Sequence, residues 1–259
     1  MVCRENLRQV EPPLETPGAA AAMAPLLVSR CALGEPSGRR LRARERLAYP
    51  LGMAPYTVSD AIDYSTNAHE CIWSTLQHSD FPSSPRLNLV YAYLVIALEH
   101  HHAIWNLVGL KLHGSAFALF RPQLETGFRG LWVNLCAAEE QINAIAQKGE
   151  EPFPRRFRDM ADDLERAYDS GGWLASFANH WSALNGYTHS GLEQLGRRFG
   201  EDGNLQPAYT EAMLIELLVS SATLSIGLFV PIFNGLGFKE KAKTLNDWLA
   251  NQPIRSAIE

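Results

Sequence analysis

Residues 115–135 read SAFALFRPQLETGFRGLWVNL, a long apolar helical pattern into which three charged side chains are set. The charges are Arg121, Glu125 and Arg129, which follow one another at intervals of four residues and so share one face of a helix. We call them the Arg–Glu–Arg row. The residues around them are mostly aliphatic or aromatic, which predicts that at least one charge is buried. Because a buried charge is costly unless it is paired, the row is either an ion pair that specifies the fold or the floor of a site.

Three residues that disfavour a helix lie in the same stretch. Pro122 has no amide N–H, so it should kink the helix and leave the carbonyl of Ala118 free. Gly127 and Gly130 each cost about 1 kcal/mol of helix stability, which makes sense if a second helix or a ligand approaches closely. Such local costs are enriched at functional sites. A buried salt bridge that fixes helix register would explain the charges equally well.

The chain on either side of this stretch has helical patterns and almost no strand signal. The expected helices span residues 56–76, 85–112, 115–147, 154–168, 173–185, 192–199, 207–233 and 238–251, with 192–199 resuming the interrupted 173–185. Ser84 and Pro85 make a favourable helix start, and the short connection 112–115 predicts an antiparallel hairpin. We therefore predict an all-α fold, a single bundle of six to seven helices.

The first 52 residues differ from the rest of the chain. They are rich in proline, glycine, alanine and arginine and show no sustained periodicity, which predicts a disordered N-terminal extension. Arginine-only basicity with alanine runs is also typical of translated GC-rich upstream sequence, so Met53 is a candidate for the true start. The folded domain is expected to span residues 53–259.

The overall composition is typical of a soluble globular protein. The 259 residues are 46% hydrophobic and carry a net charge of −5, so bulk electrostatics do not favour nucleic acid. The apolar segment 213–233 is long enough to cross a bilayer, but it contains Glu216 and several hydroxyl groups, so we expect a buried core helix and no membrane. Four scattered cysteines and the lack of a signal peptide predict a reduced, cytoplasmic protein.

Histidines gather at one level of the expected helix 85–112. His101 falls on its apolar stripe and is predicted to be a hydrogen-bonded core histidine. Glu99 and His102 have the spacing found in di-metal bundles, but such sites need a second Glu-x-x-His, and no second copy exists. We predict a local Glu99–His102 pair and no metal, and keep a metal site on these two residues as a minor alternative.

A second candidate segment runs from Asn179 to Gly191. Gly186 and Gly191 bracket four polar or aromatic residues, namely Tyr187, Thr188, His189 and Ser190. A helix interrupted here would present free backbone N–H groups, which suit an anion, and His189 could act as a base or ligand. Alternatively, one of the two hydroxyl side chains only caps the next helix, with Glu193 completing a capping box from Ser190.

These motifs together resemble an uncharacterised family of bacterial all-helical proteins. The resemblance covers roughly residues 85–230 and rests on the histidine-bearing helix, LHGSA at 112–116, FRPQLETGFRGLW at 120–132 and LNGYTHSG at 184–191. That family is in turn similar to the HEPN-type helical bundles of toxins and abortive-infection systems, at the level of fold.

The resemblance to HEPN bundles raises ribonuclease activity as an expectation. HEPN ribonucleases carry an arginine four to six residues before a histidine on one helix. No arginine stands at that distance before His180 or His189, so RNA cleavage would need a composite site of Arg121, Glu125 and His189. No phosphate-binding glycine loop, nucleophile elbow or paired-cysteine motif is found, and we expect no cofactor.

Three hypotheses follow, and whether the protein is an enzyme stays open. The first is a binding or regulatory module for a small anion or nucleotide; the second is a HEPN-like ribonuclease or toxin, with Arg121 on phosphate and His189 moving a proton. The third is an interaction module that dimerises through the core helix or the last helix. The candidate catalytic residues are Arg121, Glu125 and His189, and the candidate ligand-binding residues are Arg121, Glu125, Tyr187, Thr188, His189 and Ser190. The deciding observation is whether His189 reaches Arg121.

Overall fold

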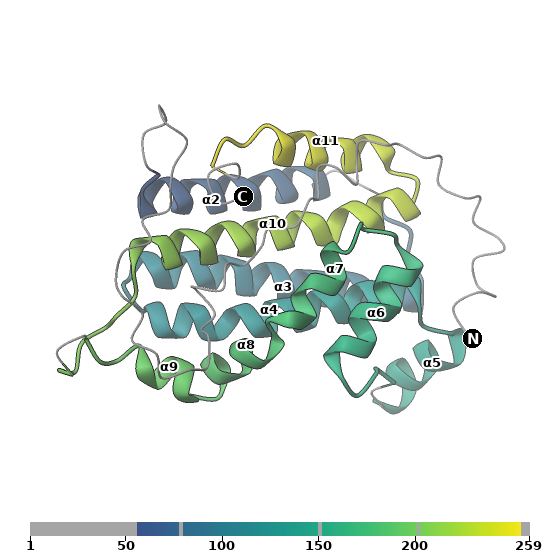
Figure 1. Ribbon diagram of the computed structural model, residues 1–259. Helices are drawn as coiled ribbons and strands as arrows, with labels where there is room; N and C mark the ends of the chain where they lie inside the picture. Colours follow the sequence, from purple (N-terminus) through teal and green to yellow (C-terminus); the bar gives the residue numbers. More distant parts are fainter. Residues whose placement is uncertain (1–55, 78–79, 150–151, 201–202, 255–259) are drawn as a thin grey trace.

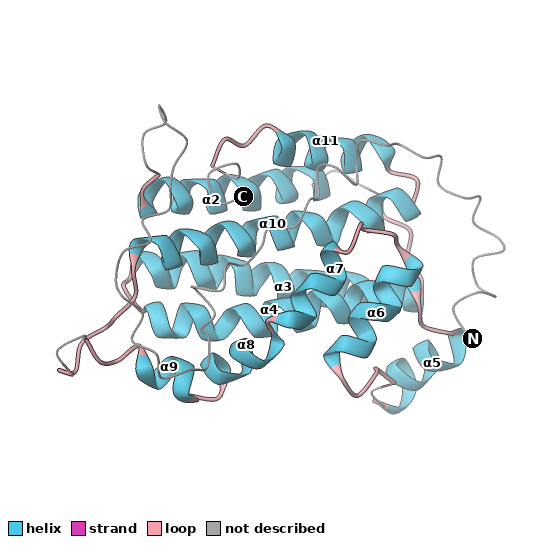
Figure 2. Ribbon diagram, viewed as in Figure 1, coloured by secondary structure: helices cyan, strands magenta, loops and turns pink. Residues whose placement is uncertain are grey.

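The structure, a computed structural model, describes residues 56–77, 80–149, 152–200 and 203–254 (Figure 1). These residues form ten α-helices and one 3-10 segment, and they contain no strand (Figure 2). The all-α prediction is confirmed, whereas the expected count of six to seven helices is wrong. The predicted extension 1–52 and the proposed start at Met53 lie outside the described residues.

Helix α10 (Glu211–Gly235) is the centre of the molecule (Figure 1). Each of its residues from 213 to 233 is buried, because α2, α3, α4 and α11 pack around it. It is the one helix in the described chain that is long and apolar enough to cross a membrane, and its burial is compatible with a soluble protein. The core-helix prediction is confirmed. No face of 213–233 is left for a second subunit, which removes the dimer surface that was expected there.

Four long helices make up the layers around α10. They are α2 (Val58–Leu76), α3 (Pro85–Gly109), α4 (His113–Leu135) and α11 (Lys239–Ala250). The hydroxyl of Ser84 accepts the N–H of Leu87 at 3.2 Å, so the predicted start of α3 is confirmed. Helices α3 and α4 lie side by side as the predicted hairpin (Figure 1). On α11, Trp248 packs on Tyr64 of α2, with ring centroids 5.1 Å apart.

The structure has more helices than expected mainly because two of the expected helices are broken. The segment expected as one helix at 115–147 divides into α4 and α5 (Glu139–Lys148), and 173–185 divides into α7 (Trp173–Ser176), the 3-10 segment η3 (Phe177–Asn179) and α8 (Trp181–Thr188). The break between α4 and α5 is stabilised by a residue of another helix. Arg86 of α3 donates to the carbonyls of Val133 and Ala137 and pairs with Glu139, so it takes up backbone acceptors at the end of α4. Helices α6 (Phe157–Ala167) and α9 (Leu192–Gly196) complete the chain order.

The two glycines of α4 lie where neighbouring helices approach it. A Cβ atom added to Gly127 would lie 2.3 Å from a methyl carbon of Leu228 on α10. At Gly130 it would lie 3.0 Å from the Cβ of Tyr93 on α3. The close helix approach that these glycines predicted is confirmed, and it fixes α4 between its two partners.

His101 lies at the heart of the bundle, as predicted. Its ring is fully buried, with Nδ1 2.8 Å from the hydroxyl of Ser221 and Nε2 3.1 Å from the carbonyl of Ser65. Burial lowers its pKa to about 4, so the ring is neutral near pH 7. Because a carbonyl only accepts, Nε2 carries the proton.

Candidate functional site

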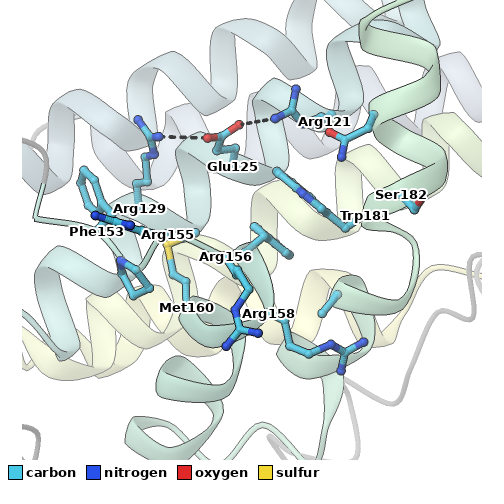
Figure 3. Close-up of a pocket in the computed structure, with 14 residues that line it drawn as sticks. Arg121, Glu125, Arg129, Phe153, Arg155, Arg156, Arg158, Met160, Trp181 and Ser182 are labelled. Atoms are coloured by element: carbon cyan, nitrogen blue, oxygen red, sulfur yellow. Dashed lines mark hydrogen bonds and ion pairs between the residues drawn. The ribbon is translucent and has the colours of Figure 1, made fainter. Parts of the chain in front are cut away.

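The Arg–Glu–Arg row is a connected ion-pair network on one face of α4 (Figure 3). Arg129 donates to one carboxylate oxygen of Glu125 at 2.9 Å, and Arg121 lies 3.5 Å from the other. The three side chains are 19, 28 and 26% exposed in chain order, so all are mostly covered yet reachable. The row is thus both a paired charge cluster and an accessible surface.

Arg121 is held from three sides. Its Nη1 lies 2.9 Å from Nε2 of His189, and its guanidinium lies 4.6 Å above the ring of Trp181. Glu125 is the third contact. His189 therefore does reach Arg121, which the sequence left open. Because a guanidinium only donates, Nε2 of His189 is the acceptor and the proton of a neutral ring lies on Nδ1. The Nε of Arg121 is buried and has no hydrogen-bond partner in the described chain.

Pro122 explains why the segment that carries His189 lies here. Helix α4 continues through this proline, and the missing N–H leaves the carbonyl of Ala118 free, as predicted. The hydroxyl of Thr188 lies 3.2 Å from that carbonyl and also bonds the carbonyl of Leu184. A backbone acceptor freed by one residue of α4 therefore anchors the end of α8 and brings His189 against Arg121.

The interruption expected at 186–191 is shorter in the structure. Tyr187 and Thr188 belong to α8, and the chain departs from helical geometry at His189 and Ser190, where Ser190 has a φ of +54°. Tyr187 is buried and stacks on Phe117 with centroids 5.0 Å apart, so it belongs to the core. Two of the four residues expected in the interruption, Tyr187 and Thr188, therefore belong to a helix.

The two bracketing glycines meet each other. The N–H of Gly191 donates to the carbonyl of Gly186 at 2.6 Å, and a Cβ at Gly186 would overlap the carboxylate of Glu193. Gly191 itself is the N-cap of α9, which has no side-chain cap bond. The predicted capping box from Ser190 to Glu193 is therefore wrong, because the tight contact between the glycines takes its place.

A cavity of about 540 Å³ opens beside Arg121. Its lining comes from α4, from the chain entering α6 and the first turn of α6, and from η3 and α8, and consists of Arg121, Glu125, Arg129, Phe153, Pro154, Arg155, Arg156, Phe157, Arg158, Met160, Ala178, Trp181, Ser182 and Asn185. The lining thus contains five arginines and one carboxylate, and of these arginines Arg121 and Arg129 contact the carboxylate (Figure 3). Of the six predicted ligand-binding residues, Arg121 and Glu125 line this space, whereas Tyr187, Thr188, His189 and Ser190 are not among its lining residues.

Three of the arginines come from the start of α6, which the sequence predicted only as a solvated helix. Arg156 is 81% exposed and pairs with Asp159 at 2.9 Å, and Arg158 donates to Asn179 at the same distance. Arg155 is exposed. The signal that could have found them is the run PRRFR at 154–158, where three arginines surround the buried Phe157.

Trp181 is enclosed within the cavity wall. Its ring stacks on Phe157 with centroids 4.0 Å apart and planes 1° from parallel. Since Phe157 covers one face, the guanidinium of Arg121 occupies the other. Asn185 follows one turn later on α8, and its side-chain oxygen, Oδ1, is buried without a hydrogen-bond partner in the described chain. Sequence reasoning missed both residues, because an aromatic and an amide on a short helix carry no distinctive pattern.

Comparison with protein families matches residues 94–231 to a family of unknown function, DUF6988. The chain belongs to this family. The DUF6988 match covers just over half of the chain, lies close to the predicted span 85–230, and includes every residue of the cavity lining. The comparisons with curated proteins and with solved structures give no match.

His69, His101 and His102 form a separate cluster outside the cavity lining. His102 stacks on Trp105 at 4.8 Å and meets His69 edge-on at 4.9 Å. Glu99 acts electrostatically on His100, and no ion pair joins it to His102 within the described residues, so the predicted Glu99–His102 pair is wrong. In the described ranges no three histidine, cysteine or acidic side chains are close enough to hold a metal. Cys71 is a free thiol, and the thiol of Cys136 donates to the carbonyl of Asp163.

The cavity is therefore rich in hydrogen-bond donors and poor in bases. Its single carboxylate, Glu125, is engaged by Arg129 and Arg121. The acceptor nitrogen of His189 is occupied by Arg121. Arginine forks match the oxygens of phosphate and carboxylate groups, so this arrangement is suited to holding an anion in place.

Proposed function

We propose that this protein is a binding module for a small anionic ligand, which enters the cavity beside α4. The observation that carries the proposal is the excess of arginine in the lining, five guanidinium groups against one carboxylate. The cavity volume of about 540 Å³ falls in the range of small-molecule sites.

The fixed position of Arg121 supports the proposal. Glu125, His189 and the face of Trp181 hold its guanidinium, while its buried Nε has no partner in the described chain. A donor that is already oriented loses little side-chain entropy when a ligand arrives, which favours binding. The side-chain amide of Asn185, whose oxygen also lacks a partner in the described residues, lies in the same wall.

Isothermal titration calorimetry of the full chain at low salt tests the proposal. The panel is inorganic phosphate, pyrophosphate, citrate and ATP. We expect at least one of them to bind, and the Arg121→Gln variant to bind it about tenfold more weakly, as the loss of one charge-assisted contact predicts. Arg166→Gln is the matched control, since Arg166 lies on α6 outside the lining and pairs with Asp163. The proposal fails if none of the four ions binds, or if Arg121→Gln and Arg166→Gln behave alike.

A HEPN-like ribonuclease is the second candidate, and the contact between Arg121 and His189 favours it. An arginine beside an exposed histidine combines phosphate binding with proton transfer. For His189 to act as a base at Nε2, it must first leave Arg121. The activity predicts that purified protein degrades RNA and that His189→Ala abolishes the cleavage, and intact RNA after incubation removes this candidate.

A further inference from the structure

The positive charge of the cavity is spread along a line. Arg121 and Arg129 lie eight residues apart on α4, which corresponds to about 12 Å of helix. Glu125 lies midway and contacts both (Figure 3). Arg155 adds a further cation to the lining, two residues after the ring of Phe153 on which Arg129 lies at 4.9 Å. The single carboxylate of Glu125 already contacts both guanidinium groups, so a ligand phosphate must either displace this carboxylate or contact the arginines on its two sides.

The aromatic rings of the lining are already covered. Trp181 has Phe157 on one face and Arg121 on the other, as described above. Phe153 carries Arg129 over its ring and is also contacted edge-on by Tyr93 at 5.9 Å. Nucleobases are commonly held by stacking on a free aromatic face. The lining therefore offers a nucleobase no free face, although it offers phosphate groups many donors.

We infer that the ligand is an ion with two or more linked phosphate groups, bound through its phosphates along α4 and without recognition of a base. This inference rests on the proposed anion-binding function and narrows its ligand to oligophosphates. A free oligophosphate and the phosphate tail of a nucleotide are the two sources of that chemistry. Two linked phosphates can contact Arg121 and Arg129 on the two sides of Glu125, whereas a single phosphate would have to displace that carboxylate to contact both.

Glu125 should affect how tightly an oligophosphate binds. Its carboxylate competes with an incoming phosphate for Arg121 and Arg129, and its negative charge repels the ligand at close range. A ligand that reaches both arginines recovers both contacts, whereas a ligand at one end recovers only one. Glu125→Gln keeps a side chain of the same shape but removes the charge, so it should bind oligophosphates more tightly than the natural protein does.

Competition calorimetry on the full chain tests the ligand class. The probes are tripolyphosphate, ATP, AMP, adenosine, inorganic phosphate and a short single-stranded RNA. We expect tripolyphosphate and ATP to bind with dissociation constants within about threefold of each other, AMP and phosphate to bind at least about tenfold more weakly, and adenosine not to compete. Arg155→Gln should weaken tripolyphosphate more than phosphate, with Arg166→Gln as the control and circular dichroism as the check on folding.

Three results would overturn the inference while leaving an anion site in place. They are ATP binding at least about tenfold tighter than tripolyphosphate, citrate binding in an Arg121-dependent way while the phosphates do not, and preference for RNA over tripolyphosphate. Equal losses for phosphate and tripolyphosphate in Arg155→Gln would contradict binding along the line. If no anion binds at all, the proposed function itself fails.

Discussion

At the scale of single residues, Arg121 is both part of an ion-pair network and accessible from the cavity. Glu125 pairs the charge of its guanidinium, and His189 and Trp181 also contact it, so its partial burial is tolerable. The same contacts fix its direction. Under the proposed function, this fixed direction would set where an anion docks in the cavity.

His101 makes stability depend on pH. Its ordinary pKa is 6.5, and burial among apolar neighbours lowers the folded value to about 4. Between these values the unfolded chain binds more protons than the folded one, so stability is full above pH 6.5 and falls as the pH drops toward 4. The free energy of unfolding should fall by about 3 kcal/mol at most. Urea unfolding at a series of pH values measures it, and His101→Gln should flatten the profile in this window. An unchanged profile in that variant would assign the pH dependence to other groups.

Gly127 sets the distance between α4 and α10. A methyl group there would meet the buried Leu228, so Gly127→Ala should lower the free energy of unfolding by about 1–2 kcal/mol despite the better helix propensity of alanine. Shortening the opposing side chain with Leu228→Ala should recover part of the loss in the double variant. Chemical denaturation of the four proteins measures this coupling. Strictly additive losses would show that the two residues do not limit the approach.

At the scale of elements, the anchoring of α8 depends on a bond that α4 leaves unmade. Pro122 frees the carbonyl of Ala118, and Thr188 reaches it from the last turn of α8. Thr188→Val should therefore cost about 1–2 kcal/mol, because a partly buried acceptor loses its partner. Adding Pro122→Ala restores an internal helix donor, so the double variant should lose less than the sum. The double-mutant cycle is measured by thermal and urea unfolding, and a coupling energy of zero would contradict the link.

Glu165 organises the loop between α6 and α7. Its carboxylate accepts the N–H groups of Ser170, Gly172 and Ala175 and the hydroxyl of Ser170. Burial would raise the pKa of this carboxyl, but the four hydrogen bonds outweigh it and lower the pKa below the ordinary 4.5. Its stabilising contribution is therefore complete above that value and is lost as the pH falls through the folded pKa. Glu165→Gln should destabilise by about 1–2 kcal/mol at pH 7 and by progressively less as the pH falls below 4.5 through the folded pKa, which urea unfolding at a series of pH values can check. Equal losses at every pH would contradict this role for the charge.

At the scale of the whole molecule, the fold was largely predictable and the site only in part. Apolar runs such as 213–233 predict a core helix from composition alone, and Gly127 and Gly130 predicted close partners for α4. The break after α4 was not predictable, since Arg86, nearly 50 residues earlier in the chain, holds it. The arginines at 155–158 look like any solvated helix start until α6 is placed beside α4.

Ligand binding should be visible in the stability of the whole chain. A ligand that binds only the folded state adds a free energy that grows with its concentration relative to the dissociation constant. Tripolyphosphate should therefore raise the thermal midpoint of the natural protein, and high salt should reduce the shift because the contacts are ionic. Differential scanning fluorimetry measures both effects, with Arg121→Gln as the insensitive variant. An equal shift in that variant would place the binding elsewhere.

The central position of α10 has a consequence for synthesis. Its partners in α2 lie about 150 residues earlier: Tyr64 meets Thr223 at 3.2 Å, and Ser65 donates to the carbonyl of Leu218 at 3.2 Å. A ribosome therefore releases α2, α3 and α4 long before the helix that covers their apolar faces exists. Contacts between residues so distant in sequence slow folding, and apolar surfaces stay exposed until α10 has been synthesised. A nascent chain halted before residue 211 would carry these helices without the core they surround, and it would be a natural client for chaperones.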